Sequence, residues 1–322
     1  MNAPRVSAIV PTYNAERFLA EALDSALAQT YQDLEIVVVN DGSTDGSAAI
    51  AAAYAARYPD KVRVIHQPNQ GLCHARNTAL GAARGTYFAL LDADDVWLPH
   101  HLADCVALLD RRPEVALVHA DIERIDTHGR SLGRNVRYWA TLATDAFHAL
   151  FLRREHVCCP TAVFRRDAVE RVGNFDTQFN RLGCEDRDLW LRISAVAPIA
   201  FLPDLHARYR LHANNMSANF DKMLSARLRL VDKFCRTHPG QPLRRRALAA
   251  AHCNLGDELM DAARRRAAFA AYARAFVLRP VEPHAVRGML RSLLKPQPAL
   301  RRLSAPAGAK TARRPATSVG NP

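Results

Sequence analysis

The sequence predicts an α/β protein with a mainly parallel sheet flanked by helices, followed by a helical C-terminal extension. Two patterns indicate this class. Short apolar runs, such as residues 36–39, are typical of parallel strands buried on both faces. These runs alternate with segments whose apolar residues recur at helical spacing, which is the order of β-α-β units. Beyond residue 220 the chain is rich in Ala and Arg, and we expect helices only.

The first part of the chain alternates strands and helices. We expect strands within residues 6–13, 34–43, 62–67 and 86–95, and helices within residues 15–30, 44–58 and 71–85. Pro59 ends the second helix and Gly85 closes the third, since proline cannot continue a helix and glycine often follows one. Connections between parallel neighbours should be right-handed crossovers.

The middle of the chain is less regular. Residues 114–126 predict one more strand followed by an excursion, whereas residues 126–158 show weak periodicity and receive no assignment. A helix is expected near residues 166–171. Another should begin at Glu185 and Asp186, because acidic side chains in a first turn interact favourably with the helix dipole.

Composition and cysteine usage exclude several classes of protein. The chain is 49% hydrophobic and 24% charged, which is ordinary for a soluble globular protein. No stretch approaches the ~18 to 20 apolar residues of a membrane span, and the N-terminus lacks the pattern of a signal peptide. The seven cysteines follow no framework spacing. We therefore expect reduced thiols and a cytoplasmic location.

The positive charge lies entirely at the C-terminal end. Of 44 Lys and Arg and 32 Asp and Glu, 16 and 4 respectively come from residue 241 onward, which leaves 28 of each sign before it. Two interpretations stay open for the Arg clusters 244–246 and 264–266: contact with an anionic surface, or a solvated helical face. From residue 296 the composition is that of a disordered tail.

Polar clusters follow three of the expected strands. They are Pro11-Thr12-Tyr13-Asn14, Asn40-Asp41-Gly42-Ser43 and Asp92-Ala93-Asp94-Asp95. Because ligands of such sheets bind beyond the carboxyl ends of the strands, these clusters predict one shared site. Carboxylates as close as those of the third cluster repel one another unless a cation lies among them. Mg²⁺ and Mn²⁺ take oxygen ligands and bridge diphosphates well.

Seven segments in order make the chain similar to family 2 glycosyltransferases, which have the nucleotide-sugar-binding fold called GT-A. The segments are VSAIVPTYN, NDGSTDGS, GLCHARNTAL, LDADD, GNFD, EDRDLWLRI and YRLHANNMS. The resemblance covers residues 5–217. It implies a nucleotide-sugar-binding and catalytic domain at residues 1–218. A helical extension at residues 219–295 and a basic, disordered tail at residues 296–322 complete the expected organisation.

The resemblance implies a metal and donor site. Asp92 and Asp94 match the family's DxD motif, with Ala93 between them in the donor site and Asp95 as a further ligand of Mn²⁺ or Mg²⁺. His212 matches a histidine that supplies another metal ligand or a diphosphate contact. The carboxylates of the aspartates suit a metal site because hard cations prefer oxygen ligands.

The resemblance also implies the residues that bind the nucleotide. Asp41 would accept a hydrogen bond from the base, since a carboxylate suits an N–H donor. Arg76 would contact the nucleotide and Arg210 a phosphate. The remaining lining residues are Pro11, Thr12, Tyr13 and Asn14.

The start of the EDRDLW segment carries the expected catalytic base. In an inverting transfer a carboxylate accepts the proton of the acceptor hydroxyl as its oxygen attacks the anomeric carbon. The resemblance gives this role to Asp186, and Glu185 is the second candidate. The leaving group is a nucleoside diphosphate, whose charge the cation stabilises.

Taken together, the motifs predict a non-processive, inverting hexosyltransferase that uses a nucleotide-diphosphate sugar, with UDP-sugar as the first expectation. The sequence contains neither a Q-x-x-R-W segment nor a membrane span, the two features that would indicate a processive synthase. The expected acceptor is a glycan or lipid-linked glycan of the cell envelope, reached at the inner face of the membrane through the Arg clusters. No interleaved aromatic residues indicate specific binding of nucleic acid. A nucleotidyltransferase and an inactive nucleotide-sugar-binding protein remain the alternatives.

Overall fold

The computed structural model describes residues 3–134, 142–143, 146–152, 156–213, 215–237 and 243–294. The strands are β1 Val6–Thr12, β2 Leu34–Asp41, β3 Val62–Gln67, β4 Tyr87–Leu90, β5 Val96–Trp97, β6 Leu117–Ile125, β7 Ser131–Arg134, β8 Leu142–Ala143, β9 Val163–Arg165 and β10 Ile199–Arg210. The helices are α1 Leu19–Leu27, α2 Ser47–Arg57, α3 Leu72–Ala82, α4 His101–Arg111, α5 Ala146–Phe151, α6 Arg166–Val172, α7 Glu185–Ser194, α8 Phe220–Thr237, α9 Arg244–Asp261, α10 Arg265–Leu278 and α11 Pro283–Leu293. The expected disordered tail lies outside the described residues.

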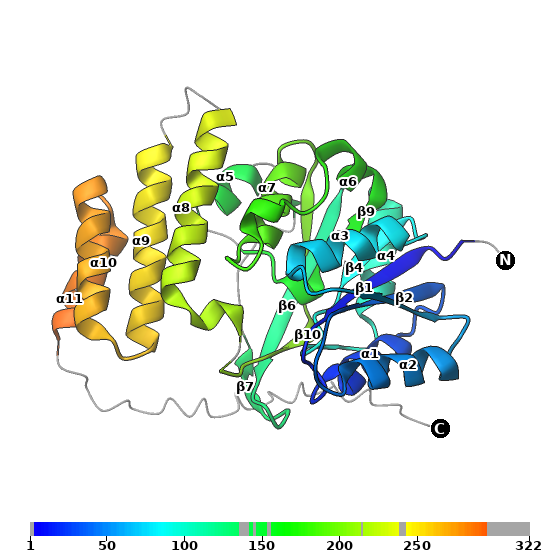
Figure 1. Ribbon diagram of the computed structural model, residues 1–322. Coiled ribbons are helices and arrows are strands. Elements are labelled where there is room, and N and C mark those ends of the chain that lie inside the picture. The colour runs from blue at the N-terminus through cyan, green and yellow to red at the C-terminus, as the bar shows by residue number, and fades with distance from the viewer. Residues whose placement is uncertain are drawn as a thin grey trace, which may run out of the picture.

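The predicted fold class is confirmed. One sheet runs in the order β3-β2-β1-β4-β9-β6-β10-β5, with helices on both faces (Figure 1). β1 pairs in parallel with β2 and β4, and β10 pairs in parallel with β6. The unassigned middle of the chain supplies β7 and α5. It is followed by β9, which pairs antiparallel with both β4 and β6 and so joins the two parallel parts.

Both faces of the sheet are buried, which explains the apolar runs in the sequence. Along β1, Ile9 faces one hydrophobic core while Ala8 and Val10 face the other. Helices α1, α2 and α4 cover the face of Ala8, and α3, α6, α7 and α8 cover the opposite face. A strand covered on both sides has no face in water for polar residues, so its apolar residues do not alternate with polar ones.

The first helix is shorter than its apolar pattern, for a tertiary reason. Residues 15–18 form a turn in which Phe18 and Leu19 N–H donate to Ala15 O. The backbone N–H groups of residues 14–16 donate to side chains between β2 and the start of α2, which fix this turn at the point where α1 begins. Ala15 N–H donates to Ser47 Oγ at 2.8 Å, and Glu16 N–H to Asp45 Oδ2 at 3.0 Å. Asn14 itself lies in the left-handed region, with φ 48°. These bonds join the first two polar strand ends.

The C-terminal helices α8 to α11 stand side by side at one end of the sheet (Figure 1). Helix α8 buries Leu230 and Phe234 in the same core as residues of α7. Helices α9 to α11 form a third core around Tyr272, whose ring lies between Gly256 and Gly288. Within the described ranges, no helix is long and apolar enough to cross a membrane.

Candidate active site

The DADD loop follows β4 as a tight turn. Leu91 N–H donates to Ile9 O at 3.1 Å, which continues the sheet, and Asp95 N–H donates to Asp92 O at 3.1 Å, which closes the turn. The side chains of Asp92 and Asp94 are 26% and 27% exposed. Asp95 is only 1% exposed. The loop therefore presents two carboxylates to solvent and keeps the third beneath them.

Asp95 has the carboxylate that best fits a cation site. Its Oδ1 accepts from Arg210 N–H at 2.9 Å, but its buried Oδ2 has no hydrogen-bond partner among the described residues. Burial raises its pKa well above the ordinary value, and Asp94 and Asp92 raise it further. A buried, unpaired carboxylate oxygen beside two other carboxylates fits a divalent cation, which would remove the repulsion and the desolvation cost together.

His212 meets the same loop from the far end of β10. Its Nε2 lies 2.8 Å from Asp94 Oδ2. The imidazole stacks on Phe18, with 5.5 Å between the ring centroids. Burial raises the pKa of Asp94 most, and the charge of Asp92 raises it further, whereas His212 lowers it. The structure thus brings Asp94 and His212 into contact, with Asp92 and Asp95 on the same loop, and their role as metal ligands stays a prediction.

Arg210 holds the loop from below. Its Nε donates to Asp94 O at 2.9 Å and its Nη2 pairs with Glu21 at 2.6 Å. The residue is 1% exposed, and its guanidinium lies over the ring of Phe18 at 4.7 Å. These contacts occupy the guanidinium within the protein. Its geometry therefore suits a positioning role for the DADD loop better than the phosphate contact that the resemblance implied.

Arg76 links the two halves of the site. Its Nη2 lies 2.7 Å from Asp92 Oδ1, and its Nη1 lies 2.8 Å from Glu185 Oε1. It also contacts Cys159 Sγ at 3.2 Å, and it lies over the ring of Phe175 at 5.3 Å. A fully buried guanidinium is fixed by such partners, because an unpaired charge would be costly there. The Arg76 guanidinium therefore pairs with one carboxylate of the DADD loop and with one at the start of α7.

The two acids at the start of α7 have different surroundings. Glu185 is 6% exposed and paired with Arg76, and burial raises its pKa to about 7 against the opposing effect of Arg76. Asp186 is partly exposed, and its Oδ1 accepts from Arg187 N–H at 2.6 Å. Burial also raises the pKa of Asp186. Of the two, Asp186 has the carboxylate that a second molecule can reach.

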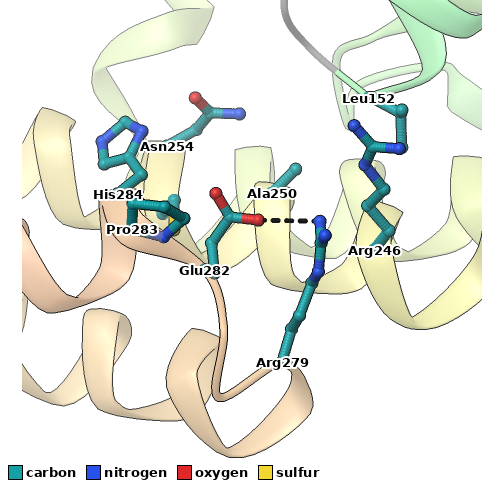
Figure 2. A pocket seen from close by; sticks show the side chains of 9 residues that line it. Leu152, Arg246, Ala250, Asn254, Arg279, Glu282, Pro283 and His284 are labelled. Atoms are coloured by element: carbon teal, nitrogen blue, oxygen red, sulfur yellow. Dashed lines mark hydrogen bonds and ion pairs between the residues drawn. The ribbon is translucent and has the colours of Figure 1, made fainter.

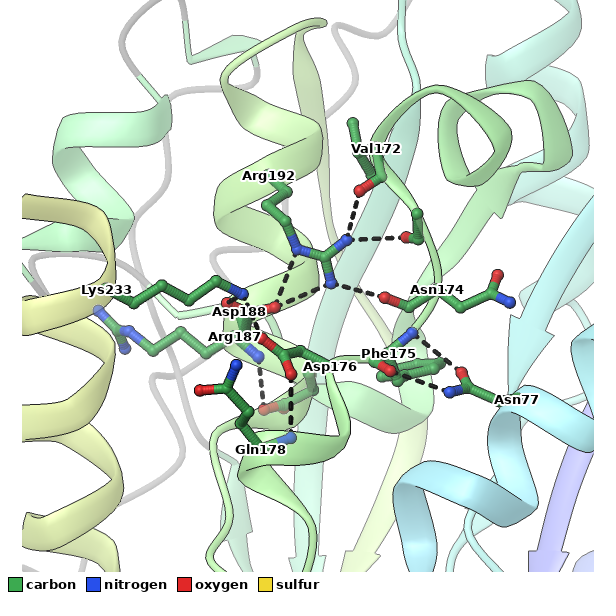
Figure 3. Close-up of polar contacts among 12 residues, drawn as sticks. Asn77, Val172, Asn174, Phe175, Asp176, Gln178, Arg187, Asp188, Arg192 and Lys233 are labelled. Carbon is green, nitrogen blue, oxygen red and sulfur yellow. Dashed lines mark hydrogen bonds and ion pairs between the residues drawn. The ribbon is translucent and has the colours of Figure 1, made fainter. Parts of the chain in front are cut away.

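The start of α7 is held in place by a network that the sequence did not reveal (Figure 3). Asp188, which is fully buried, pairs with Arg192 at 2.8 Å and with Lys233 of α8. Lys233 also pairs with Asp176 at 2.7 Å, and Arg192 donates to the carbonyls of residues 172–174. The loop before α7 and the first C-terminal helix thereby fix the direction of Asp186.

Asp41 bonds to the end of β3 and to the loop that follows it. Its Oδ1 accepts from Gln67 Nε2 at 2.6 Å and from Gln70 N–H at 2.9 Å, and its Oδ2 accepts from Gly71 N–H at 2.7 Å. Gly71 has φ 91°, and a Cβ there would overlap the side chain of Asn180. Asp41 thus holds the loop before α3 in place, and any contact with a base would use its remaining acceptor capacity.

The end of β1 lines the same edge of the sheet. Pro11 and Thr12 are buried, whereas Tyr13 is 52% exposed. Thr12 Oγ1 is buried without a hydrogen-bond partner among the described residues. Asn14 Oδ1 accepts from Thr44 N–H at 2.8 Å, which joins the first two strand ends. An exposed aromatic ring beside an unpaired hydroxyl is compatible with a bound base and sugar.

Several contacts of the site were missed from sequence. Gln67 ends β3, so the rule of carboxyl ends could have found it. Phe175 lies within the GNFD segment but was not singled out, and Phe18 and Cys159 carried no local signal. A cavity of about 480 Å³ lies elsewhere: residues of α9 and of the turn before α11 line it, among them Arg246, Asn254 and Arg279 (Figure 2). Arg279 pairs there with Glu282 at 3.0 Å.

Comparison with known proteins identifies the family. The profile described as Glycosyl transferase family 2 matches residues 7–173. This chain belongs to that family. An uncharacterized glycosyltransferase of Nostoc sp. is 33% identical over 219 residues, which cover 66% of this chain and 67% of the relative. An uncharacterized glycosyltransferase of Rickettsia felis is 33% identical over 217 residues, but the match spans only 35% of that longer relative.

Two solved structures of nucleotide-sugar complexes have a similar fold. The mannosyltransferase PcManGT of Pyrobaculum calidifontis, in complex with GDP-Man and Mn²⁺, has a TM-score of 0.61 and 25% identity, covering 92% of this chain and 82% of its own. TarS of S. aureus, in complex with UDP-GlcNAc, also has a TM-score of 0.61, with 18% identity and 89% of each chain covered. The expected family and GT-A fold are therefore confirmed.

Proposed function

We propose that the chain is an inverting, non-processive hexosyltransferase. It would transfer a sugar from a nucleotide diphosphate, with a UDP-sugar as the first candidate, to a hydroxyl group of a glycan or lipid-linked glycan. The observation that carries the proposal is the fork of Arg76, which holds Asp92 of the metal loop and Glu185 beside the base. Such a link sets the diphosphate end of the donor against the carboxylate of Asp186.

In this mechanism Asp186 acts as the general base. Its carboxylate accepts the proton of the acceptor hydroxyl while that oxygen attacks the anomeric carbon. The bond from the anomeric carbon to the diphosphate oxygen breaks on the opposite side, so the configuration inverts. Glu185 is the less suitable base because Arg76 already occupies its carboxylate. Its role is to hold Arg76, which in turn holds Asp92.

Asp92, Asp94, Asp95 and His212 would hold the divalent cation. Mn²⁺ or Mg²⁺ bound there would stabilise the charge that develops on the leaving diphosphate. The unpaired Oδ2 of Asp95 supports this assignment. The Mn²⁺ and GDP-Man bound to the P. calidifontis mannosyltransferase, which is 25% identical, support both a cation and a nucleotide sugar.

The nucleotide would lie over the ends of β1 and β2. Asp41 would accept from the base, and Tyr13 and Asn14 would flank the ribose and phosphates. The contacts of Asp41 with Gln67 and Gly71 support this placement, because they fix the carboxylate before the donor arrives. Because the Asp41 carboxylate is already held in place, binding of the base would not carry the entropic cost of ordering a loop.

A nucleotidyltransferase remains the second candidate because it would use the same cation and nucleotide. The two reactions release different products. A glycosyltransferase releases a nucleoside diphosphate, whereas a nucleotidyltransferase forms or consumes pyrophosphate. We expect slow, Mn²⁺-dependent release of UDP or GDP from one donor in a panel of nucleotide sugars. Pyrophosphate chemistry without such release would contradict the proposal, and binding without turnover would indicate an inactive binding protein.

The acceptor side is proposed to lie at an anionic membrane surface, on its inner face. Among the basic clusters, Arg245 and Arg266 are exposed, whereas Arg244 pairs with Asp232 at 2.7 Å. On α11, Leu290 and Leu293 are 58% and 68% exposed. Each basic side chain near an anionic surface contributes roughly 1 kcal/mol to binding, within a Debye length.

Co-sedimentation with vesicles tests the membrane contact separately from catalysis. The full chain should bind vesicles that contain anionic lipid at low salt and leave them at high salt. Arg245→Glu with Arg266→Glu should weaken that binding, whereas Arg57→Glu, on α2 of the catalytic unit, should not. Equal binding to neutral and anionic vesicles would indicate a solvated helical face.

A further inference from the structure

A group of histidine, aspartate and cysteine side chains lies behind the DADD loop and has no part in the proposed mechanism. His100, His101, Asp104 and Cys105 begin helix α4, and His206 lies on β10. The spacing of four places His100 beside Asp104 and His101 beside Cys105. Ligand atoms of His100, Asp104 and His206 lie within 4.8 Å of one another. Chain segments about 100 residues apart thus meet at one point.

The hydrogen bonds of His100 and His206 leave one ring nitrogen of each available to a metal ion. His100 Nε2 lies 2.9 Å from Leu205 O, which can only accept, so Nε2 carries the proton and Nδ1 is free. His206 Nδ1 lies 3.3 Å from His101 Nδ1, and its Nε2 faces Asp104 Oδ2 at 3.9 Å. When His206 donates to His101, its Nε2 is free as well. A histidine that binds a metal through one ring nitrogen typically donates a hydrogen bond from the other one, as here.

We propose that His100, Asp104 and His206 bind a transition-metal ion of the zinc class. Two imidazoles and one carboxylate form a ligand set that Zn²⁺ takes in sites with a position open to water. Asp104 has a side chain that is 51% exposed, so the site opens to solvent. Ligand atoms around a tetrahedral zinc ion are about 3.4 Å apart, given bonds of about 2.1 Å. A small rotation of Asp104 closes the remaining gap.

A second set, His101, Cys105 and His206, is fully buried. Cys105 Sγ lies 3.7 Å from His101 Nδ1. All three of these residues are buried, whereas the half-exposed Asp104 opens the outer set to solvent. An ion and its remaining water can reach the outer set without disturbing the core, so the geometry favours it. His101 then acts as the partner that orients His206.

The ion would clip α4 to β10 without touching the donor. His206 lies four residues before Arg210, which is roughly 13 Å along a strand. Helix α4 begins six residues after Asp95. The clip would therefore fix the two segments that carry the DADD loop and Arg210. This proposal does not depend on the proposed function.

Zinc affinity of the metal-free full chain tests the inference, measured by competition with a chromogenic chelator. The wild type should bind one Zn²⁺ with an affinity that Asp94→Asn leaves unchanged. Asp104→Asn and His100→Gln should each lower it at least about 10-fold, the size expected even for second-shell changes. Asp60→Asn, an exposed aspartate elsewhere, is the matched control. The melting temperature should rise with Zn²⁺ in the wild type and control only.

Two outcomes would overturn the assignment. If Asp104→Asn and His100→Gln keep the wild-type affinity, the outer set does not bind the ion. If Cys105→Ser lowers the affinity while Asp104→Asn does not, the buried set binds it instead. Asp104 is half exposed, so Asp104→Asn removes little packing, and circular dichroism checks that each variant is folded.

Discussion

Replacement of Arg76 by methionine removes the guanidinium and keeps an apolar side chain of similar length. The residue is 1% exposed, and it pairs with Glu185 at 2.8 Å and Asp92 at 2.7 Å. Removing one partner of a buried ion pair typically costs about 3 to 5 kcal/mol, because the other charge stays buried without compensation. Glu185 bears most of this cost, since Asp92 is still a quarter exposed and keeps contact with water.

The cost should depend on pH in a defined direction. Burial already raises the pKa of Glu185 to about 7 with Arg76 present. A folded-state pKa above the unfolded value means that the folded state binds the proton more tightly, so stability falls as pH rises between the two values. Without Arg76 the folded-state pKa rises further, and each unit corresponds to 1.36 kcal/mol. The loss in Arg76→Met should therefore be larger at pH 8 than at pH 6.

Urea unfolding at pH 6 and pH 8 measures this difference. Arg76→Met combined with Glu185→Gln should recover most of the stability at pH 8, because no uncompensated charge remains. Arg166→Met is the control, since Arg166 donates to the carbonyls of Gly85 and Ala83 and lies over the Phe88 ring. Equal losses at both pH values, without recovery in the double variant, would refute the argument from a buried charge.

Three further predictions concern catalysis and packing. Asp94→Asn should remove Mn²⁺-dependent turnover without changing the urea midpoint, and near-normal turnover in saturating Mn²⁺ would contradict the metal assignment. Asp186→Asn should lower kcat by ~10² to 10⁴-fold at unchanged donor affinity, and should remove the rise of rate with pH that a raised pKa implies. Asp167→Asn, which removes another first-turn acid, should change neither kcat nor its pH dependence. A parallel fall in donor affinity in Asp186→Asn would indicate a binding role for Asp186. Gly288→Ala should cost about 1 to 3 kcal/mol in thermal unfolding, because the new Cβ overlaps the Tyr272 ring. Gly81→Ala, which meets open space on α3, should not destabilise the protein, and equal effects would argue against the overlap.

The sequence by itself determined the framework of the catalytic unit. The strands β1 to β4 and the helices between them followed from apolar runs and helical periodicity, which are local properties of the chain. The polar clusters at the ends of β1, β2 and β4 followed for the same reason, since a parallel sheet places those ends at one edge. Helix lengths were less certain, because contacts of residues 14–16 with a distant loop decide where α1 begins.

Only the tertiary structure decided which partners these side chains have. Glu185 and Asp186 are adjacent in sequence, yet Arg76 occupies one and leaves the other accessible. Arg210 matched a phosphate-binding position but pairs with Glu21, a residue 189 positions away. The insertion of β9 between β4 and β6, and the meeting of His100 with His206, are equally non-local. No periodicity encodes such pairs, because burial and the competition for hydrogen-bond partners arise only when distant segments pack together.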